Sequence, residues 1–185
     1  MTRLGYVLAS SALMAVAAGC SSSDSNDNTS PKKSIAELAK CDESDIADDL
    51  PWSGAQIDSA TGKLKEPLPA GFVIATTVGW PTDEGRPVIQ QKTIESIQIS
   101  FTYPGLLAAK FGTSKHCGSG RSLSIWKDQA SMMNWVLGKD HTAVMPLAST
   151  HTNGWETTHW SSPTNNELPT WDEARGKLDT ARAGR

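Results

Sequence analysis

The chain has 185 residues and a formal net charge of −3, from 17 basic and 20 acidic side chains. No block of Lys or Arg interrupts this mildly acidic balance, so the sequence lacks the basic patch of a nucleic-acid-binding protein, and no such partner is expected. The length allows one domain of about 150 residues with its own core, besides any leader segment.

The first 19 residues have the pattern of a secretory signal peptide. Arg3 gives a basic start, and an uncharged stretch rich in Ala, Leu and Val runs from Leu4 to Ala18, which is too short to span a bilayer. The stretch ends in Ala-Ala-Gly-Cys20, which resembles the lipobox of bacterial lipoprotein precursors. We therefore expect cleavage before Cys20 and lipid on its thiol. The alternative is an ordinary secretory signal followed by a chance cysteine.

Residues 20–33 are then expected to be a lipidated, disordered tether, because positions 21–33 contain no apolar side chain. Each buried methylene contributes about 0.8 kcal/mol, so two or three acyl chains hold a protein firmly on a membrane. Cleavage removes Arg3 and changes the formal charge from −3 to −4. The sequence thus predicts an extracytoplasmic lipoprotein of the cell envelope. Ser21 favours the outer membrane, since an Asp there retains some lipoproteins at the inner one.

Two cysteines remain besides Cys20. In an oxidising compartment Cys41 and Cys117 are predicted to form one disulfide, which closes a long loop and contributes on the order of 4 kcal/mol. The alternatives are two free thiols or a metal site. Only His116 lies beside Cys117 as a further ligand, so we expect no metal.

Residues 34–70 are predicted to form a cover segment and not a second domain. Ser34 and Glu37 have the spacing of a capping box, which predicts a short helix. The rest of the segment is rich in proline and is expected to be irregular, with a turn at Thr61-Gly62 that joins two short strands.

Residues 71–185 show the pattern of a single α+β domain. β-branched residues predict a strand at 72–78, and apolar side chains spaced i, i+3, i+7 predict a helix over 88–103. The order β-α-β-β-α-β plus a short C-terminal helix predicts a ferredoxin-like antiparallel sheet with helices on one face. The remaining predicted elements are strands at 106–111 and 121–126, a helix from Asp128 that weakens at Gly138 and restarts at Asp140 through Met145, a strand at 154–161, and a helix from Thr170.

Two stretches resemble a known superfamily. The run SLSIWKDQASMMNWVLGKDHTAVM (Ser122 to Met145) resembles the third strand and second helix of the dimeric α+β barrel superfamily, which includes antibiotic-biosynthesis and haem-degrading monooxygenases. The tail from His159 is similar to the end of an uncharacterised branch, with a Trp-rich last strand and a Pro-Thr-x-x-Glu-Ala helix. The likeness covers Phe72 to Arg182. It implies a homodimer that closes a barrel through the open, apolar sheet face.

The resemblance also bears on haem. In haem-degrading relatives the ligand lies between helices and sheet, held by an Asn on the first strand, a Trp on the second helix and a His further along. Trp135 matches the Trp, nine residues after Trp126. Met145 stands at the spacing of the His, while His141 comes earlier, and the first strand, residues 74–79, has no Asn. One of three haem residues is therefore present.

The candidate ligand pocket consists of Trp126, Trp135, His141 and Trp160. A cofactor-free monooxygenase of the superfamily would hold a flat aromatic substrate among such side chains; the alternative is that the tryptophans fill a core and His141 packs or caps a helix. The sequence thus favours a lipoprotein that binds a small hydrophobic or aromatic molecule, with or without oxidation. The rival is a structural or interaction lipoprotein that kept the fold and lost the site.

Overall fold

The computed structural model describes residues 33–162 and 166–184. The predicted signal peptide, Cys20 and nearly all of the tether therefore lie outside the described residues. One compact unit spans residues 32–185 and holds every element named below. In the part of the chain that is described, no helix is both long enough and apolar enough to cross a membrane.

The described elements follow one another in an order that contains the predicted β-α-β-β-α-β series. They are α1 (Ile35–Leu38), β1 (Ala47–Ser53), β2 (Val73–Pro81), α2 (Arg86–Ser100), β3 (Leu106–Ser114), β4 (Ser119–Trp126), α3 (Gln129–Val136), α4 (Lys139–His151), β5 (Thr152–Trp160) and α5 (Trp171–Ala183).

The strands form one sheet in the order β1-β3-β4-β2-β5, and all neighbours run antiparallel. β2 to β5 have the strand order of a ferredoxin-like fold, with β1 added at the edge beside β3. The predicted fold class is confirmed. β4 and β2 lie at the centre of the sheet, so their side chains define what each face packs against.

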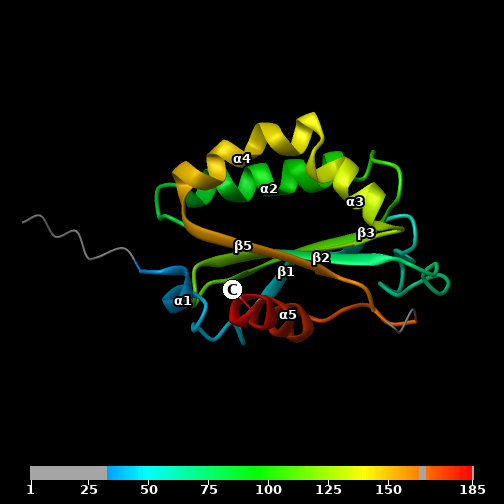
Figure 1. Ribbon diagram of the computed structural model, residues 1–185, viewed down its shortest axis with the longest axis horizontal. Helices are drawn as coiled ribbons and strands as arrows, with labels where there is room; N and C mark the ends of the chain where they lie inside the picture. The colour runs from blue at the N-terminus through cyan, green and yellow to red at the C-terminus, as the bar shows by residue number, and fades with distance from the viewer. Residues whose placement is uncertain (1–32, 163–165, 185) are drawn as a thin grey trace, which may run out of the picture. The chain divides into compact units, whose positions relative to one another are not determined.

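Helices cover both faces of the sheet (Figure 1). α2, α3 and α4 lie on one side, and α1 and α5 lie on the other. We call these the α2/α4 face and the α5 face. The alternation of side chains along each strand decides which residues belong to which face, and directly paired residues of neighbouring strands share a face.

The α5 face contains a closely packed core. Along β2, the side chains that point to this face are almost inaccessible: Ile74, Thr76, Val78 and Trp80 are 1–3% exposed. α5 adds Ala174 and Leu178, and the N-terminal segment adds apolar side chains of α1 and of residues 52–68. The face through which a barrel-closing homodimer was expected is thus covered within one chain. The homodimer stays a prediction, and it would have to use another surface.

A buried lysine joins three elements on the α5 face. The Lys110 Nζ of β3 lies 3.9 Å from the ring centroid of Trp171 at the start of α5, and 3.7 Å from an Asp48 oxygen of β1. The Trp171 Nε1 donates a hydrogen bond to Asp48 at 2.8 Å. Burial lowers the pKa of Lys110, against the opposing effect of Asp48. This contact fixes the start of α5 to the edge of the sheet.

The cover segment differs from its prediction. The capping box of Ser34 and Glu37 is present, and the Thr61-Gly62 turn lies between the bridged residues Ile57 and Leu64. Residues 47–53, expected to be irregular, instead form β1. The sequence did not indicate a strand here because it contains Asp48, Asp49 and Pro51, which are unfavourable in strands. They are tolerated because β1 is an edge strand with two register shifts.

The end of one helix also differs from its prediction. α4 was expected to end at Met145, but it continues through Pro146 to His151, so His151 lies in a helix and not in a turn. The Asp128 cap and the break between α3 and α4 are as predicted: the Asp128 carboxylate accepts from the Ser131 N–H at 2.7 Å, and α4 restarts after Gly138. Thr170 caps α5 in the same manner.

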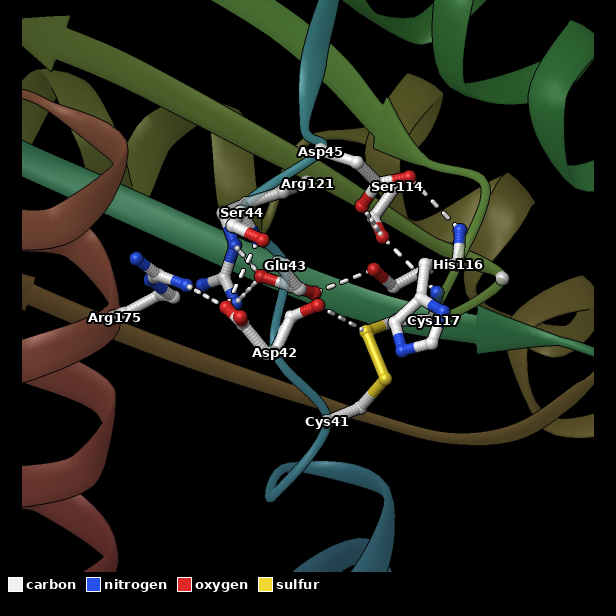
Figure 2. The surroundings of a disulfide bond; sticks show 12 residues. Cys41, Asp42, Glu43, Ser44, Asp45, Ser114, His116, Cys117, Arg121 and Arg175 are labelled. Atoms are coloured by element: carbon white, nitrogen blue, oxygen red, sulfur yellow. Dashed lines mark hydrogen bonds and ion pairs between the residues drawn. A yellow bond between two sulfur atoms is a disulfide. The ribbon is translucent and has the colours of Figure 1, made fainter.

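The predicted disulfide between Cys41 and Cys117 is present and spans 76 residues of sequence. It ties the N-terminal segment to the hairpin of β3 and β4 (Figure 2). Next to it the buried Glu43 carboxylate accepts from the Arg121 Nη2 at 2.6 Å and from the Ser119 hydroxyl. Asp45 accepts from Ser114 and from the backbone N–H of His116, and the Ser114 hydrogen bond lowers the pKa of Asp45.

Candidate functional site

The α2/α4 face of the sheet is hollow where the α5 face is filled. On the central strand β2, Thr77 is exposed and Ala75 and Gly79 are only half-buried, although neighbouring strands flank all three. The helices above them bury little: α2 has only Ile97 and Ser100 buried, and α4 has no buried residue. The centre of the sheet thus remains accessible beneath two helices, which indicates a cavity between the sheet and these helices.

That cavity has a volume of about 610 Å³, within the range of small-molecule binding sites. Its floor consists of small side chains on β2, β4 and β5, which leave room because they project little from the sheet. The floor residues are Ala75, Thr77, Gly79, Gly120, Ser122, Ser124 and Thr157, and the helices contribute Ile89, Thr93, Ser96, Ile97, Val144, Met145, Leu147 and Ala148.

One end of the cavity is aromatic and closed. Trp126 at the end of β4 is 1% exposed, and Met132 and Trp135 of α3 are 3% and 9% exposed. The Trp135 ring makes edge-on contacts with Tyr103, at 4.8 Å between centroids, and with His141, at 5.3 Å. The Tyr103 hydroxyl donates to Asp140 at 2.8 Å, and this hydrogen bond raises the pKa of Tyr103. Trp135 is therefore held rigidly as a wall.

His141, at the start of α4, also lines the cavity. Its Nδ1 lies 2.9 Å from the backbone carbonyl oxygen of Val136. A carbonyl only accepts hydrogen bonds, so Nδ1 carries the hydrogen in the neutral ring and Nε2 is the acceptor. Burial lowers the pKa of His141, partly opposed by the Val136 hydrogen bond. His141 is thus a neutral acceptor near pH 7, with no hydrogen-bond partner recorded for Nε2 in the described residues.

Three of the four predicted pocket residues, Trp126, Trp135 and His141, meet at this end of the cavity. Trp160 does not. It pairs with Ile74 and therefore faces α5, where its Nε1 donates to Glu173 at 3.0 Å and its ring packs on the core. The prediction for Trp160 is wrong because the alternation along β5 places it on the opposite face.

Sequence reasoning missed Trp155 and the small floor residues. Trp155 pairs with Gly79, lines the cavity and is 39% exposed. His159 shares its face but lies beyond the lining residues. The available signal was the alternation of Gly120, Ser122 and Ser124 with larger side chains in β4, since small residues at every second position of a central strand leave space under a helix.

The cavity does not reproduce the residue set that holds haem in relatives. Trp135 is present, and the His141 Nε2 is an available ligand atom. On β2, the strand on which relatives carry an Asn, the residues that line the cavity include Ala75, Thr77 and Gly79. No asparagine is among the described residues that line the cavity, so the residues present do not fit haem. Within the described residues, no group of three or more His, Cys, Asp or Glu side chains is arranged to hold a metal ion.

No protein-family model matches the chain, and no curated protein matches it. Several solved structures resemble this chain. One is a protein provisionally named a monooxygenase from Fusobacterium nucleatum, with 12% identity and a TM-score of 0.50, over 66% of this chain and 56% of that one. Another is a protein from Mycobacterium tuberculosis, with 8% identity and a TM-score of 0.50, over 52% and 100%.

A third is SnoaB, a cofactor-independent oxygenase from Streptomyces nogalater, with 10% identity and a TM-score of 0.47, over 55% of this chain and 100% of that one. The structural neighbours include ferredoxin-fold proteins of the antibiotic-biosynthesis monooxygenase kind. This chain spans only about half the length of the Fusobacterium protein. Likeness at such identities shows the fold alone.

Proposed function

We propose that the chain is a lipid-anchored, extracytoplasmic lipoprotein of the cell envelope, and that its domain binds a small hydrophobic or aromatic molecule between the sheet and α2/α4. The observation that carries the binding proposal is the 610 Å³ cavity, floored by small side chains and closed at one end by Trp126 and Trp135. These tryptophans belong to a buried hydrophobic cluster, and the cavity lies beside them.

The binding proposal is tested by titration of the purified full chain with 1-aminoanthracene, a neutral flat aromatic whose fluorescence rises in apolar surroundings. We expect a saturable rise that other flat aromatics reverse. Ser122→Phe places a ring on the cavity floor and should abolish binding, whereas Ser59→Phe, in an exposed turn, should not. Equal binding by both variants, or none by the unmodified chain, would contradict the proposal. Haem belongs in the same panel.

Oxidation of the bound molecule is a second candidate. It is favoured by the His141 Nε2, which is a neutral acceptor at the aromatic end of the cavity and is able to take a hydrogen bond or a proton from a bound hydroxyl group. Oxygen consumption in the presence of a bound aromatic, absent in His141→Gln, would support it. The rival role, a structural or interaction lipoprotein without a ligand, is favoured by the lack of the strand Asn that relatives use to hold haem, but it does not explain the cavity.

The anchor is proposed from the sequence, and the outer membrane is its proposed location. Cys20→Ser should move the protein from the membrane fraction to the soluble fraction of the envelope, since the acyl chains supply most of the membrane affinity. Labelling with radioactive palmitate should be lost in the same variant. Persistent labelling or persistent membrane association would refute lipid attachment at Cys20.

A further inference from the structure

The cavity is long and runs parallel to the strands. Its floor follows β2 from Ala75 to Pro81, which is about 20 Å at roughly 3.3 Å per residue. Ala75 pairs with Ser124 and Gly79 pairs with Gly120, so the two ends of the cavity lie at opposite ends of the central strands. The closed aromatic end described above is at the Ala75 end, and the exposed Trp155 lies at the Gly79 end.

The opposite end of the cavity carries basic side chains. Arg86 is the first residue of α2, and Lys115 follows the last residue of β3. A third base, Lys92, lies further along α2. Among the described residues, the acidic side chain in the lining is that of Asp49 of β1, beside Phe111 and Gly112 of β3. Three of the four charged lining residues are thus basic, although the whole chain has a net charge of −3.

The two basic groups at this end are available to a ligand. The Arg86 guanidinium is oriented by hydrogen bonds to the Gly118 carbonyl oxygen and to Asp83, each 3.0 Å. The Asp83 side chain is 94% exposed, so water and salt screen its charge. Within the described residues the exposed Lys115 ammonium has no hydrogen bond or ion pair, although the backbone N–H of Lys115 interacts with the Asp45 carboxylate. Lys92, by contrast, is paired with Glu95 at 2.7 Å and has less charge to offer.

Because one end of the cavity is apolar and aromatic and the other end is basic, we infer the class of ligand: a single-chain amphiphile with an anionic head group. Its apolar tail lies over the small floor residues and ends against Trp126 and Trp135, and its carboxylate or phosphate meets Arg86 and Lys115. The inference rests on the proposed function, because it concerns the same cavity. A ligand of this shape also accounts for the length of the cavity, which exceeds that of a single flat ring system.

The test compares three ligands with the same tail and different head charge: dodecanoate, dodecanol and dodecyltrimethylammonium. Each is titrated calorimetrically, below its micelle concentration, into the purified full chain in detergent-free buffer. We expect dodecanoate to bind at least about tenfold more tightly than either of the others. Its affinity should fall with added salt, because charges at the cavity mouth are screened. Dodecyl phosphate distinguishes a carboxylate from a phosphate as the preferred head group.

Variants locate the head-group site. Lys115→Gln should reduce the ratio of dodecanoate to dodecanol affinity several-fold, and Arg86→Gln should do the same. Lys63→Gln removes an exposed lysine from the turn between Ile57 and Leu64, outside the cavity lining, and should leave the ratio unchanged. Because the Lys115 side chain is exposed and its ammonium pairs with no described residue, Lys115→Gln keeps the test informative if Arg86→Gln perturbs the fold.

The outcomes separate this inference from the proposed function. If 1-aminoanthracene binds but dodecanoate neither binds nor displaces it, the inference is overturned and the binding function stands. Equal affinity for dodecanol, tighter binding of the cationic ligand, or a ratio unaffected by Lys115→Gln would likewise overturn the inference. If no ligand of either panel binds, both the inference and the proposed function fail.

Discussion

At the scale of single residues, His141 is a titratable group whose pKa is lowered by its position in the cavity wall. Burial lowers its pKa, so the folded chain keeps the ring neutral at pH values where the unfolded chain, with a pKa of about 6.5, is already protonated. Below that pH the unfolded state binds more protons than the folded state. The free energy of unfolding must therefore fall as the pH falls through this range.

The first prediction concerns this dependence of the free energy of unfolding on pH. The free energy of unfolding, measured by urea denaturation at pH 7.5, 6.5 and 5.5, should decrease stepwise, and His141→Gln should show a smaller decrease. Asp45 and Asp128 also have lowered pKa values, but their effect is confined to pH values near 4 and below. If His141→Gln showed the full decrease in the free energy of unfolding, a group other than His141 would be responsible for it.

The second prediction separates two tryptophans that were indistinguishable in the sequence. Trp135→Ala and Trp160→Ala should each destabilise the chain, by up to about 3 to 5 kcal/mol, because each removes a large packed ring. Only Trp135→Ala should also weaken 1-aminoanthracene binding, since Trp160 faces α5. Affinities are compared at a temperature at which both variants are folded. Loss of binding in Trp160→Ala alone would contradict the assignment of faces.

The site residues could be predicted only in part, and the reason is the period of a strand. Trp126, Trp135 and His141 were predicted to line one pocket, and all three line the cavity. In β5, however, Trp155 and Trp160 differ by five positions, so they must face opposite sides of the sheet. Choosing between them required knowledge of which face lay under α2 and α4, and the sequence of β5 alone does not contain it.

At the scale of elements, the N-terminal segment is bound to the sheet by the disulfide and by the buried pair of Glu43 and Arg121, which are 3% and 4% exposed. Replacement of both Cys41 and Cys117 by Ser should lower the free energy of unfolding by up to about 4 kcal/mol, since the loop they close is long. Denaturant titration with and without reductant measures this. Equal midpoints for the replaced and oxidised chains would show that the disulfide contributes nothing.

Glu43→Gln should destabilise the chain by about 3 to 5 kcal/mol, because it leaves the Arg121 guanidinium buried without its charged partner. Asp42→Asn is the matched control. Asp42 pairs with Arg175 at 3.6 Å and its side chain is 73% exposed, so its loss should cost less than about 1 kcal/mol. Similar midpoints for the two variants in a thermal melt would contradict a structural role for the buried pair.

Most elements were predictable because local signals and packing agree. The capping box of Ser34 and Glu37, the N-cap of Thr170 and the β3–β4 hairpin are of this kind. β1 was missed because its acidic residues and Pro51 oppose strand propensity, and only pairing with β3 overrides them. α4 was predicted too short because Pro146 usually ends a helix.

At the scale of the whole molecule, one face of the sheet differs from its prediction. The α5 face was expected to be open and to close a barrel with a second subunit, but it contains a packed core. α5 and the N-terminal segment supply within one chain the cover that a second subunit would otherwise give. The α2/α4 face was predicted to hold a ligand between the sheet and the helices, and it contains both the cavity and the buried cluster around Trp126 and Trp135.

The proposal that this domain holds a small hydrophobic or anionic amphiphilic molecule above the sheet depends on the cavity. The most direct test is the titration of 1-aminoanthracene into the unmodified chain and into Ser122→Phe and Ser59→Phe. We predict saturable binding by the unmodified chain and Ser59→Phe, and none by Ser122→Phe. Binding that Ser122→Phe leaves unchanged would show that the ligand lies elsewhere, and the absence of binding by the unmodified chain would contradict a ligand-binding role.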